Sequence, residues 1–146
     1  MITRYKPQST IPYSLHDMRV VKMELVDNNL KLYFENGYVE CKEPYPQVDG
    51  NLTIEGIDVD LFATVYFLSK NGREGGFRGK KMPLTEFLDK YGNFVSYEII
   101  DELYGYNQVR YSGWLLLPDA KDFIEMDMQM YFEGDIVYDV RKNRNV

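Results

Sequence analysis

The densest group of side chains suited to recognition chemistry lies in the second half of the chain. Four large aromatic residues and one arginine occur close together there: Tyr104, Tyr106, Arg110, Tyr111 and Trp114. Tyrosine, tryptophan and arginine dominate the energetics of protein interfaces, because the rings supply contact area for few frozen torsions and the guanidinium directs hydrogen bonds. These five residues are the predicted binding site, either as an exposed recognition surface or as the lining of a small-ligand cleft.

Residue types that usually carry out catalysis are scarce. His16 is the only histidine and Cys41 the only cysteine. His16 and Asp17 are predicted to organise the entry into the first strand through local hydrogen bonds. Acidic neighbours at Glu40 and Glu43 disfavour a thiolate, so Cys41 is expected to behave as a small buried hydrophobic residue. The sequence therefore predicts no catalytic residue.

Metal and cofactor sites are not predicted either. One histidine and one cysteine cannot build a closed zinc site. Two carboxylate pairs, Asp58/Asp60 and Glu125/Asp127, have the i, i+2 spacing that places both side chains on one face of a strand. Such pairs hold Mg²⁺ or Ca²⁺ in some proteins or take part in acid–base chemistry, but solvent-facing charges on a strand produce the same spacing. We expect no metal and no cofactor.

Charge is unevenly distributed around a net value of −6. Residues 70–81 hold the basic side chains of Lys70, Arg73, Arg78, Lys80 and Lys81 against the single acid Glu74. The glycines of this segment lack the spacing of a phosphate-binding loop, and Lys81 stands where that loop requires serine or threonine. The rest of the chain is strongly acidic, which argues against nucleic-acid binding and suits a basic protein partner.

Alternation of apolar and polar residues predicts strands through most of the chain. The predicted strands cover residues 21–25, 30–35, 38–42, 52–54, 59–68, 94–104, 109–117, 123–132 and 136–140. Residues 27–29 predict a turn, and Asn36-Gly37 is a strong hairpin signal, so the first three strands are predicted to form a meander. Residues 69–81 are rich in glycine and are predicted to be irregular.

One helix is predicted over residues 83–91. Four apolar residues follow the i, i+3, i+4, i+7 spacing of a single helical face: Leu84, Phe87, Leu88 and Tyr91. Pro83 suits the first turn of a helix and Gly92 suits its C-terminal cap.

These elements predict a mainly β fold, an antiparallel β-barrel or β-sandwich, formed by residues 1–146 as one domain. A parallel sheet is not expected, because the pattern lacks the repeated alternation of strand and helix. The apolar sides of the alternating segments predict the core. Its predicted members are Val21, Met23, Leu25, Leu32, Phe34, Val65, Phe67, Met126, Met128 and Met130.

Two short segments resemble known families. Residues 63–76, which run from Ala63 to Lys70 and on to Glu74-Gly75-Gly76, resemble a strand and turn in the C-terminal β-barrel of elongation factor Tu. This resemblance implies a small barrel, although Phe77 stands where that family has arginine. Residues 15–34 resemble the opening of small bacterial proteins of unknown function, some of which are immunity proteins against toxins. The second resemblance implies an immunity-type or mobile-element-encoded interaction protein.

Targeting segments, apolar stretches and the cysteine count indicate the cellular compartment in which we expect the protein to work. Residues 1–8 lack the apolar run of a signal peptide, and no stretch has the roughly 20 apolar residues of a membrane span. A single cysteine excludes an intramolecular disulfide and favours a reducing compartment. We therefore expect a cytoplasmic, non-catalytic protein that binds a protein partner or self-associates, away from membranes. The alternative is a small-ligand-binding barrel, or an unrecognised enzyme with a cavity lined by tyrosine, aspartate and arginine.

Overall fold

The computed structural model describes residues 1–3, 11–68 and 79–143 of the chain. Within these residues there are eleven strands and one helix. The strands are β1 (Tyr13–Ser14), β2 (Met18–Val26), β3 (Asn29–Phe34), β4 (Tyr38–Glu40), β5 (Gln47–Ile54), β6 (Ala63–Leu68), β7 (Gly79–Pro83), β8 (Tyr97–Gly105), β9 (Gln108–Leu115), β10 (Ile124–Tyr131) and β11 (Ile136–Asn143). The helix, α1, spans Leu84–Tyr91. The fold is mainly β with one short helix, which confirms the class expected from the alternating sequence.

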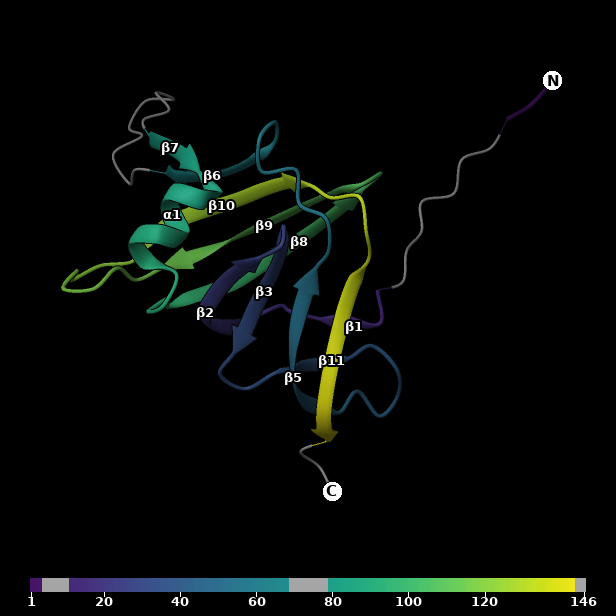
Figure 1. Cartoon of the computed structure of the whole chain (residues 1–146). Coiled ribbons are helices and arrows are strands. Elements are labelled where there is room, and N and C mark those ends of the chain that lie inside the picture. The colour runs from purple at the N-terminus through teal and green to yellow at the C-terminus, as the bar shows by residue number, and fades with distance from the viewer. Residues whose placement is uncertain (4–10, 69–78, 144–146) are drawn as a thin grey trace.

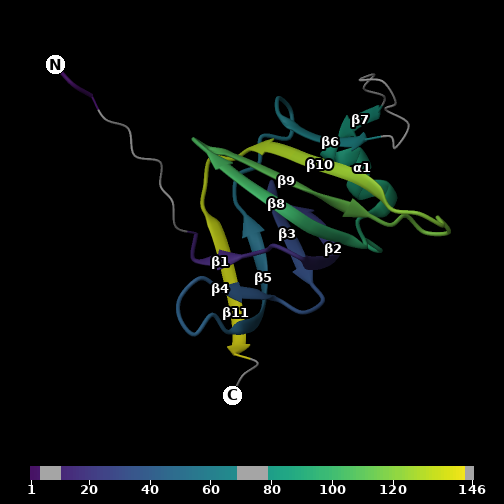
Figure 2. The same cartoon turned by 180° about the vertical axis from the view of Figure 1, so that it is seen from behind.

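All of these strands belong to one antiparallel sheet. Their order is β1-β4-β5-β3-β2-β8-β9-β10-β6-β7, and β11 joins the sheet by pairing with β5. The sheet is strongly curled, so that β8, β9 and β10 run across the direction of β5 and β11 (Figures 1 and 2). The described strands do not close into a complete barrel, but the curl encloses a core to which strands from both halves contribute.

The hairpin between β2 and β3 has the turn that its sequence predicts. Val26 pairs with Asn29, so Asp27 and Asn28 are the two central residues of the turn. Their φ angles are +52° and +63°. Positive φ at both central positions is the geometry of a type I′ turn, which asparagine and aspartate tolerate better than most residues.

The Asn36-Gly37 pair, by contrast, does not form the predicted hairpin. The strand that follows it, β4, pairs with β5 and β1 and not with β3. Gly37 has a φ of +65°, and a Cβ there would lie 1.8 Å from the carbonyl oxygen of Val48 in β5. Asn36 lacks the positive φ that a type I′ turn requires. The pair therefore forms a corner at which the chain stays beside β5, since β3 and β4 both pair with that strand.

A β-bulge in β2 makes the predicted burial of Val21 wrong. The register of β2 shifts between Val20 and Lys22. Val20 and Met23 are therefore both buried, whereas Val21 between them is 37% exposed. An inserted residue reverses the alternation of faces, and a strict period of two does not anticipate it.

The other predicted core positions are all at least partly covered. Those that are buried are Met23, Leu32, Phe34, Val65, Met126, Met128 and Met130. Leu25 and Phe67 are partly buried and pack against the core. The three methionines share the inner side of β10, whose register with β6 and β9 contains no bulge.

Several predicted boundaries shift. The strand predicted over residues 52–54 is the end of β5, which begins at Gln47, and the strand predicted over residues 94–104 begins only at Tyr97. The strand predicted over residues 59–68 begins only at Ala63, because Asp58 starts a turn in which its Oδ1 accepts the Leu61 N–H at 3.1 Å. Residues 79–81, predicted to be irregular, belong to β7, which pairs with β6. The remainder of that segment, residues 69–78, lies outside the described residues.

The helix α1 lies where the apolar spacing places it. Pro83 precedes its first residue, and the Gly92 N–H donates to the Leu88 carbonyl at its end. Leu84 and Phe87 are its buried residues. The Phe87 ring lies 6.0 Å from the ring of Phe67 in β6, so the helix covers the inner side of the sheet at this end of the core.

Candidate functional site

The predicted binding residues all lie on the β8–β9 hairpin, but alternation along the strands separates them. Tyr106 forms part of the tip and is 91% exposed. Arg110 and Trp114 point outward from β9 and are both exposed. Tyr111 points inward and is fully buried, and Tyr104 on β8 lies on the same inner side and is half-buried. The structure thus brings Arg110 and Trp114 together on one face and Tyr104 and Tyr111 on the other.

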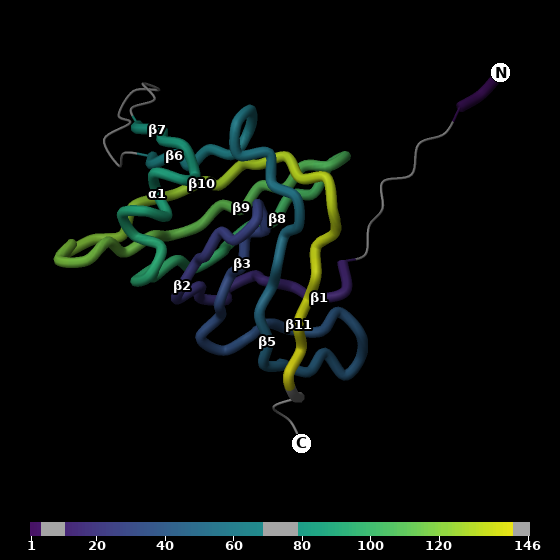
Figure 3. The backbone as a smooth tube through the Cα atoms, in the orientation of Figure 1, coloured from purple at the N-terminus to yellow at the C-terminus, as the bar shows by residue number. Residues whose placement is uncertain are grey.

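The tip of this hairpin contacts the segment that follows β10, the strand next to β9. Figure 3 shows it beside the passage from β10 to β11. There the Phe132 N–H donates to the Asn107 carbonyl at 3.0 Å. This bond helps to hold the two faces of β9 in a fixed position relative to the core.

Outward-pointing residues of β8, β9 and β10 form a continuous surface, called here the outer face. It comprises Glu98, Asp101, Leu103, Arg110, Ser112, Trp114, Glu125, Asp127 and Gln129. Side chains directly opposite each other on antiparallel strands have Cβ atoms about 4.5–5.5 Å apart. The register therefore arranges the outer face in three rows, which are Glu98–Trp114–Glu125, Asp101–Ser112–Asp127 and Leu103–Arg110–Gln129.

In the first row, Trp114 stands between two carboxylates. Glu98 of β8 and Glu125 of β10 are its register partners, and the tryptophan itself is 40% exposed. Among the described residues, no basic side chain lies within 4.0 Å of the carboxylates of Glu98, Glu125 or Asp101. The described His, Cys, Asp and Glu residues also form no group suited to hold a metal ion. Arg19 of β2 is the register partner of Glu98 but forms its ion pair with Glu35. Among the described residues, this row therefore offers an aromatic surface with a carboxylate on each side that has no ion-pair partner.

In the second row, Asp127 is buried although it belongs to the outer face. It is 4% exposed, and its Oδ2 accepts a hydrogen bond from Arg110 Nη2 at 2.5 Å. Its other oxygen, Oδ1, is buried without a hydrogen-bond partner among the described residues. A buried carboxylate oxygen without a donor costs free energy, so this atom is a natural acceptor for an incoming N–H group.

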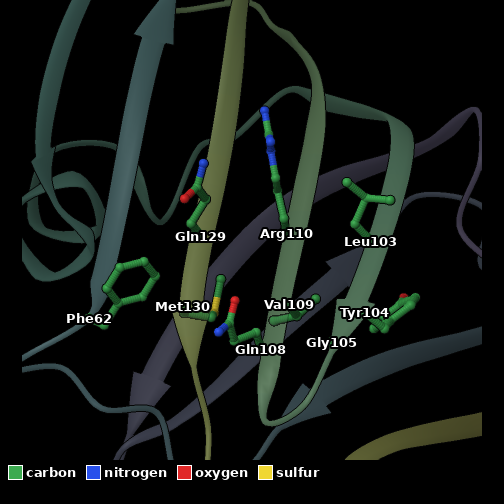
Figure 4. Close-up of a pocket in the computed structure, with 9 residues that line it drawn as sticks. All are labelled: Phe62, Leu103, Tyr104, Gly105, Gln108, Val109, Arg110, Gln129 and Met130. Carbon is green, nitrogen blue, oxygen red and sulfur yellow. The ribbon is translucent and has the colours of Figure 1, made fainter. Parts of the chain in front are cut away.

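A groove of about 320 Å³ lies at the Arg110 end of the outer face (Figure 4). Gln129, Arg110 and Leu103 stand in a row across it. Phe62, from the turn before β6, contributes a wall on the β10 side. The remaining lining residues are Tyr104, Gly105, Gln108, Val109 and Met130. The groove mixes apolar and polar groups and extends the outer face toward the hairpin tip.

On the inner side, a second β-bulge places a carboxylate among tyrosines. The register of β8 against β9 shifts between Ile99 and Asp101. Because of that extra residue, Glu102 lies opposite Tyr111 on the inner side, where uninterrupted alternation would have pointed it outward. Glu102, Tyr104, Tyr111 and Tyr138 are called here the tyrosine cluster. Tyr138 reaches it from β11.

Glu102 is held by two hydrogen bonds. Its Oε1 accepts the Tyr104 hydroxyl at 2.6 Å, and its Oε2 accepts the Leu15 N–H at 2.9 Å. Burial nevertheless raises the pKa of Glu102 above its ordinary value, and both hydrogen bonds oppose that shift. Burial, followed by the charge of Glu102, raises the pKa of Tyr138 to about 12. The phenols therefore stay protonated at neutral pH and can only donate to, or bridge toward, the carboxylate.

The hydroxyl of Tyr111 is the unusual member of the tyrosine cluster. Its side chain is fully buried, and its oxygen makes no hydrogen bond of normal geometry with the described residues. Burial raises its pKa, and the nearby Tyr104 hydroxyl partly offsets that rise. Tyr97, on the neighbouring strand, is equally buried but donates to the Met126 carbonyl at 2.8 Å.

The two residues examined for catalysis have local roles. His16 Nδ1 donates to the Ile100 carbonyl at 2.5 Å, and this bond is the main cause of the raised pKa of His16. The Asp17 N–H donates to the Ile99 carbonyl, so the turn before β2 is tied to the bulge of β8. Cys41 is exposed, which makes its predicted burial wrong, and desolvation together with Glu102 raises the pKa of its thiol. His16 Nε2 also lies 3.3 Å from Asp17 Oδ2, and both side chains are exposed.

Some of these carboxylates are recognisable in the sequence, but the residues that surround them in the folded sheet are not. The Glu125/Asp127 pair was recognisable from its spacing, whereas Glu98 and Asp101 joined it only through strand register. Glu102 was missed, because a bulge inverted its face. The other predicted pair, Asp58/Asp60, lies in the turn before β6 and away from these groups.

Comparison with known proteins gives no match, whether to a protein-family model, a curated protein or a solved structure. In the described part of the chain, no helix has the length and apolar character needed to cross a membrane.

Proposed function

We propose that the protein is a non-catalytic binding protein that recognises a basic segment of a partner protein on its outer face. The observation that carries this proposal is the first row, in which Trp114 is exposed between Glu98 and Glu125, and neither carboxylate forms an ion pair within 4.0 Å with a described residue. An indole attracts cations over its ring, and carboxylates at its edges add charge-assisted hydrogen bonds. A lysine or arginine side chain satisfies both groups at once.

Charge complementarity supports a basic polypeptide as the occupant. The nine residues of the outer face include four carboxylates, those of Glu98, Asp101, Glu125 and Asp127, and one guanidinium, that of Arg110. Arg19 of β2 adds a second guanidinium beside Glu98, which leaves an excess of negative charge. The net charge of −6 adds a long-range attraction that speeds the encounter with a basic partner and repels nucleic acid. Exposed Leu103 and the nearby groove supply apolar contact next to the charged rows.

The dimensions of the outer face suit an extended peptide or an exposed loop. The distance along β9 from Gln108 at the groove to Trp114 is about 20 Å, at roughly 3.4 Å per residue. A segment of about six residues lying along β9 would therefore place one side chain over Trp114 and another in the groove. Residues 15–34 resemble the opening of small bacterial proteins of unknown function, some of which are immunity proteins against toxins, and this resemblance agrees with a binding function.

Trp114 is the only tryptophan, so its fluorescence reports binding at the outer face directly. The probe is a six-residue peptide containing both lysine and arginine, and the control probe replaces each basic residue with glutamate. We expect the basic peptide to change Trp114 emission saturably, with an affinity that falls as salt rises. The glutamate peptide should produce no change.

A matched pair of variants locates the effect. Glu98→Gln with Glu125→Gln should weaken the basic peptide at least tenfold. Asp89→Asn with Glu133→Gln removes the same charge from exposed positions elsewhere and should change the affinity less than twofold. Equal weakening by both pairs would contradict the proposal, since attraction to net charge alone would then explain binding. Sedimentation of the chain alone provides a further check, because self-association abolished by the first pair would show that a second copy covers the face.

A further inference from the structure

We infer that the basic residue seated over Trp114 is an arginine, whose guanidinium stacks on the indole and donates an N–H to the orphan Oδ1 of Asp127. This inference rests on the proposed function and names the partner side chain more narrowly. It combines two independent features of the outer face, namely the aromatic residue flanked by carboxylates and the buried acceptor in the adjacent row.

The buried acceptor, Asp127 Oδ1, is the feature that favours arginine over lysine as the partner side chain. Asp127 is 4% exposed, its Oδ2 is bonded by Arg110, and its Oδ1 has no donor among the described residues. Arg110 shows that a guanidinium can reach this carboxylate from the outer face. The side chain of Arg110 remains 46% exposed. Because Oδ1 is closed to solvent, an incoming guanidinium must displace the groups that cover it. A second planar donor group can complete the coordination of Asp127 from the outer face.

Register places this acceptor within reach of a group seated on Trp114. Trp114 pairs with Glu125, and Asp127 lies two residues further along the same strand. Such diagonal neighbours are about 7–8 Å apart at Cα, a distance that long side chains bridge. A guanidinium lying flat on the indole directs its N–H groups outward in its own plane, so that one edge faces Glu125 and Asp127 of β10 and the opposite edge faces Glu98 of β8.

Arginine and lysine differ in shape, in hydration and in the number of hydrogen-bond donors, and all three affect how they would bind here. The guanidinium is planar and weakly hydrated, it stacks on aromatic rings, and its five donors form a rigid fork. The ammonium group of lysine is a compact, strongly hydrated charge that loses more hydration when it approaches a buried oxygen. The outer face should therefore distinguish between two side chains of equal charge.

The experiment compares three peptides that differ at one residue, which is arginine, lysine or an arginine methylated on its terminal nitrogens. Binding is followed by Trp114 fluorescence at fixed ionic strength. We expect the arginine peptide to bind at least tenfold more tightly than the lysine peptide. The methylated peptide should bind about as weakly as the lysine peptide, because methylation keeps the charge but removes N–H donors. Asp127→Asn, checked for folding by circular dichroism, should reduce the preference for arginine to less than threefold.

Failure of this inference can be distinguished from failure of the proposed function. Equal, salt-sensitive binding of the arginine and lysine peptides would overturn the arginine assignment and leave a basic-segment binding surface intact. Undiminished binding of the methylated peptide would overturn the role of Asp127 Oδ1 even if Asp127→Asn does not fold. If neither basic peptide alters Trp114 emission, the proposed function and this inference both fail.

Discussion

At the scale of single residues, two buried tyrosines on neighbouring strands differ in one hydrogen bond. Tyr97 and Tyr111 are both fully buried, but only the Tyr97 hydroxyl has a hydrogen-bond partner of normal geometry among the described residues. A satisfied buried hydroxyl stabilises a fold modestly, whereas an unsatisfied one costs the desolvation of its oxygen. The pair therefore offers a matched comparison within one core.

Tyr111→Phe is expected to stabilise the protein by about 1 kcal/mol, because it removes an unpaired buried hydroxyl without leaving a cavity. Tyr97→Phe should destabilise it by about 1–2 kcal/mol, because the Met126 carbonyl loses its donor. Urea unfolding of the two variants measures both free energies. Loss of stability in Tyr111→Phe would show that its hydroxyl is bonded in solution, for example through a buried water bridging to Glu102.

The raised pKa of Glu102 makes a contribution to stability that depends on pH. In the folded protein this carboxyl releases its proton at a higher pH than in the unfolded chain. The folded state therefore binds more protons than the unfolded state between the two pKa values, and stability falls as pH rises through that interval. The contribution is complete below the unfolded pKa and is lost above the folded one.

Glu102→Gln should remove that part of the pH dependence, because an amide does not titrate in this range and can still accept one of the two hydrogen bonds. Free energies of unfolding for wild type and variant, measured between pH 4 and pH 8, provide the test. The wild type should lose stability relative to the variant as pH rises. Parallel curves would contradict the assignment of the raised pKa to Glu102.

At the scale of elements, glycines allow strands to pass at close range. A Cβ on Gly113 in β9 would lie 1.9 Å from the Glu98 carbonyl oxygen in β8, next to the bulge that turns Glu102 inward. A Cβ on Gly105, at the end of β8, would have its nearest neighbour 3.8 Å away. On this hairpin, the strands therefore leave no room for a side chain at Gly113, whereas a Cβ at Gly105 would make only an ordinary van der Waals contact.

Gly113→Ala is expected to destabilise the protein by about 3 kcal/mol or more, because the collision is with backbone that cannot move alone. Gly105→Ala should change stability by less than about 1 kcal/mol, since space is available and the unfolded chain loses freedom. Thermal unfolding of both variants compares them. A Gly113→Ala protein as stable as Gly105→Ala would show that β8 and β9 are further apart than the structure places them.

Much at this scale could be predicted from the sequence. Alternation located β10, apolar spacing located α1, and the Asp27-Asn28 turn formed as its residues require. Alternation failed at the bulges near Val21 and Ile100, because one inserted residue reverses the face of every position beyond it. The corner at Gly37 was also missed, since a strong hairpin signal says nothing about a third strand that competes for the same edge.

At the scale of the whole molecule, the curl of the sheet gives the two faces of β9 different environments. One face points into the core and the other to solvent, so the five predicted binding residues are divided between the core and the outer surface. Neighbours brought in by register, such as Glu98 and Asp101, come from another strand and complete the site. The order of the strands determines which residues become neighbours of β9. That order depends on pairings such as Val20 with Tyr97, which link distant parts of the chain.

The most direct test of the outer face as the binding surface is a map of backbone amide chemical shifts during titration with the basic peptide. The proposal predicts that the largest changes fall on residues 98–103 of β8, 110–114 of β9 and 125–129 of β10. It also predicts that the indole N–H of Trp114 moves with them, while α1, β4 and β11 stay unchanged. Changes concentrated on the sheet edges at β7 and β11, or absent from β9, would contradict it.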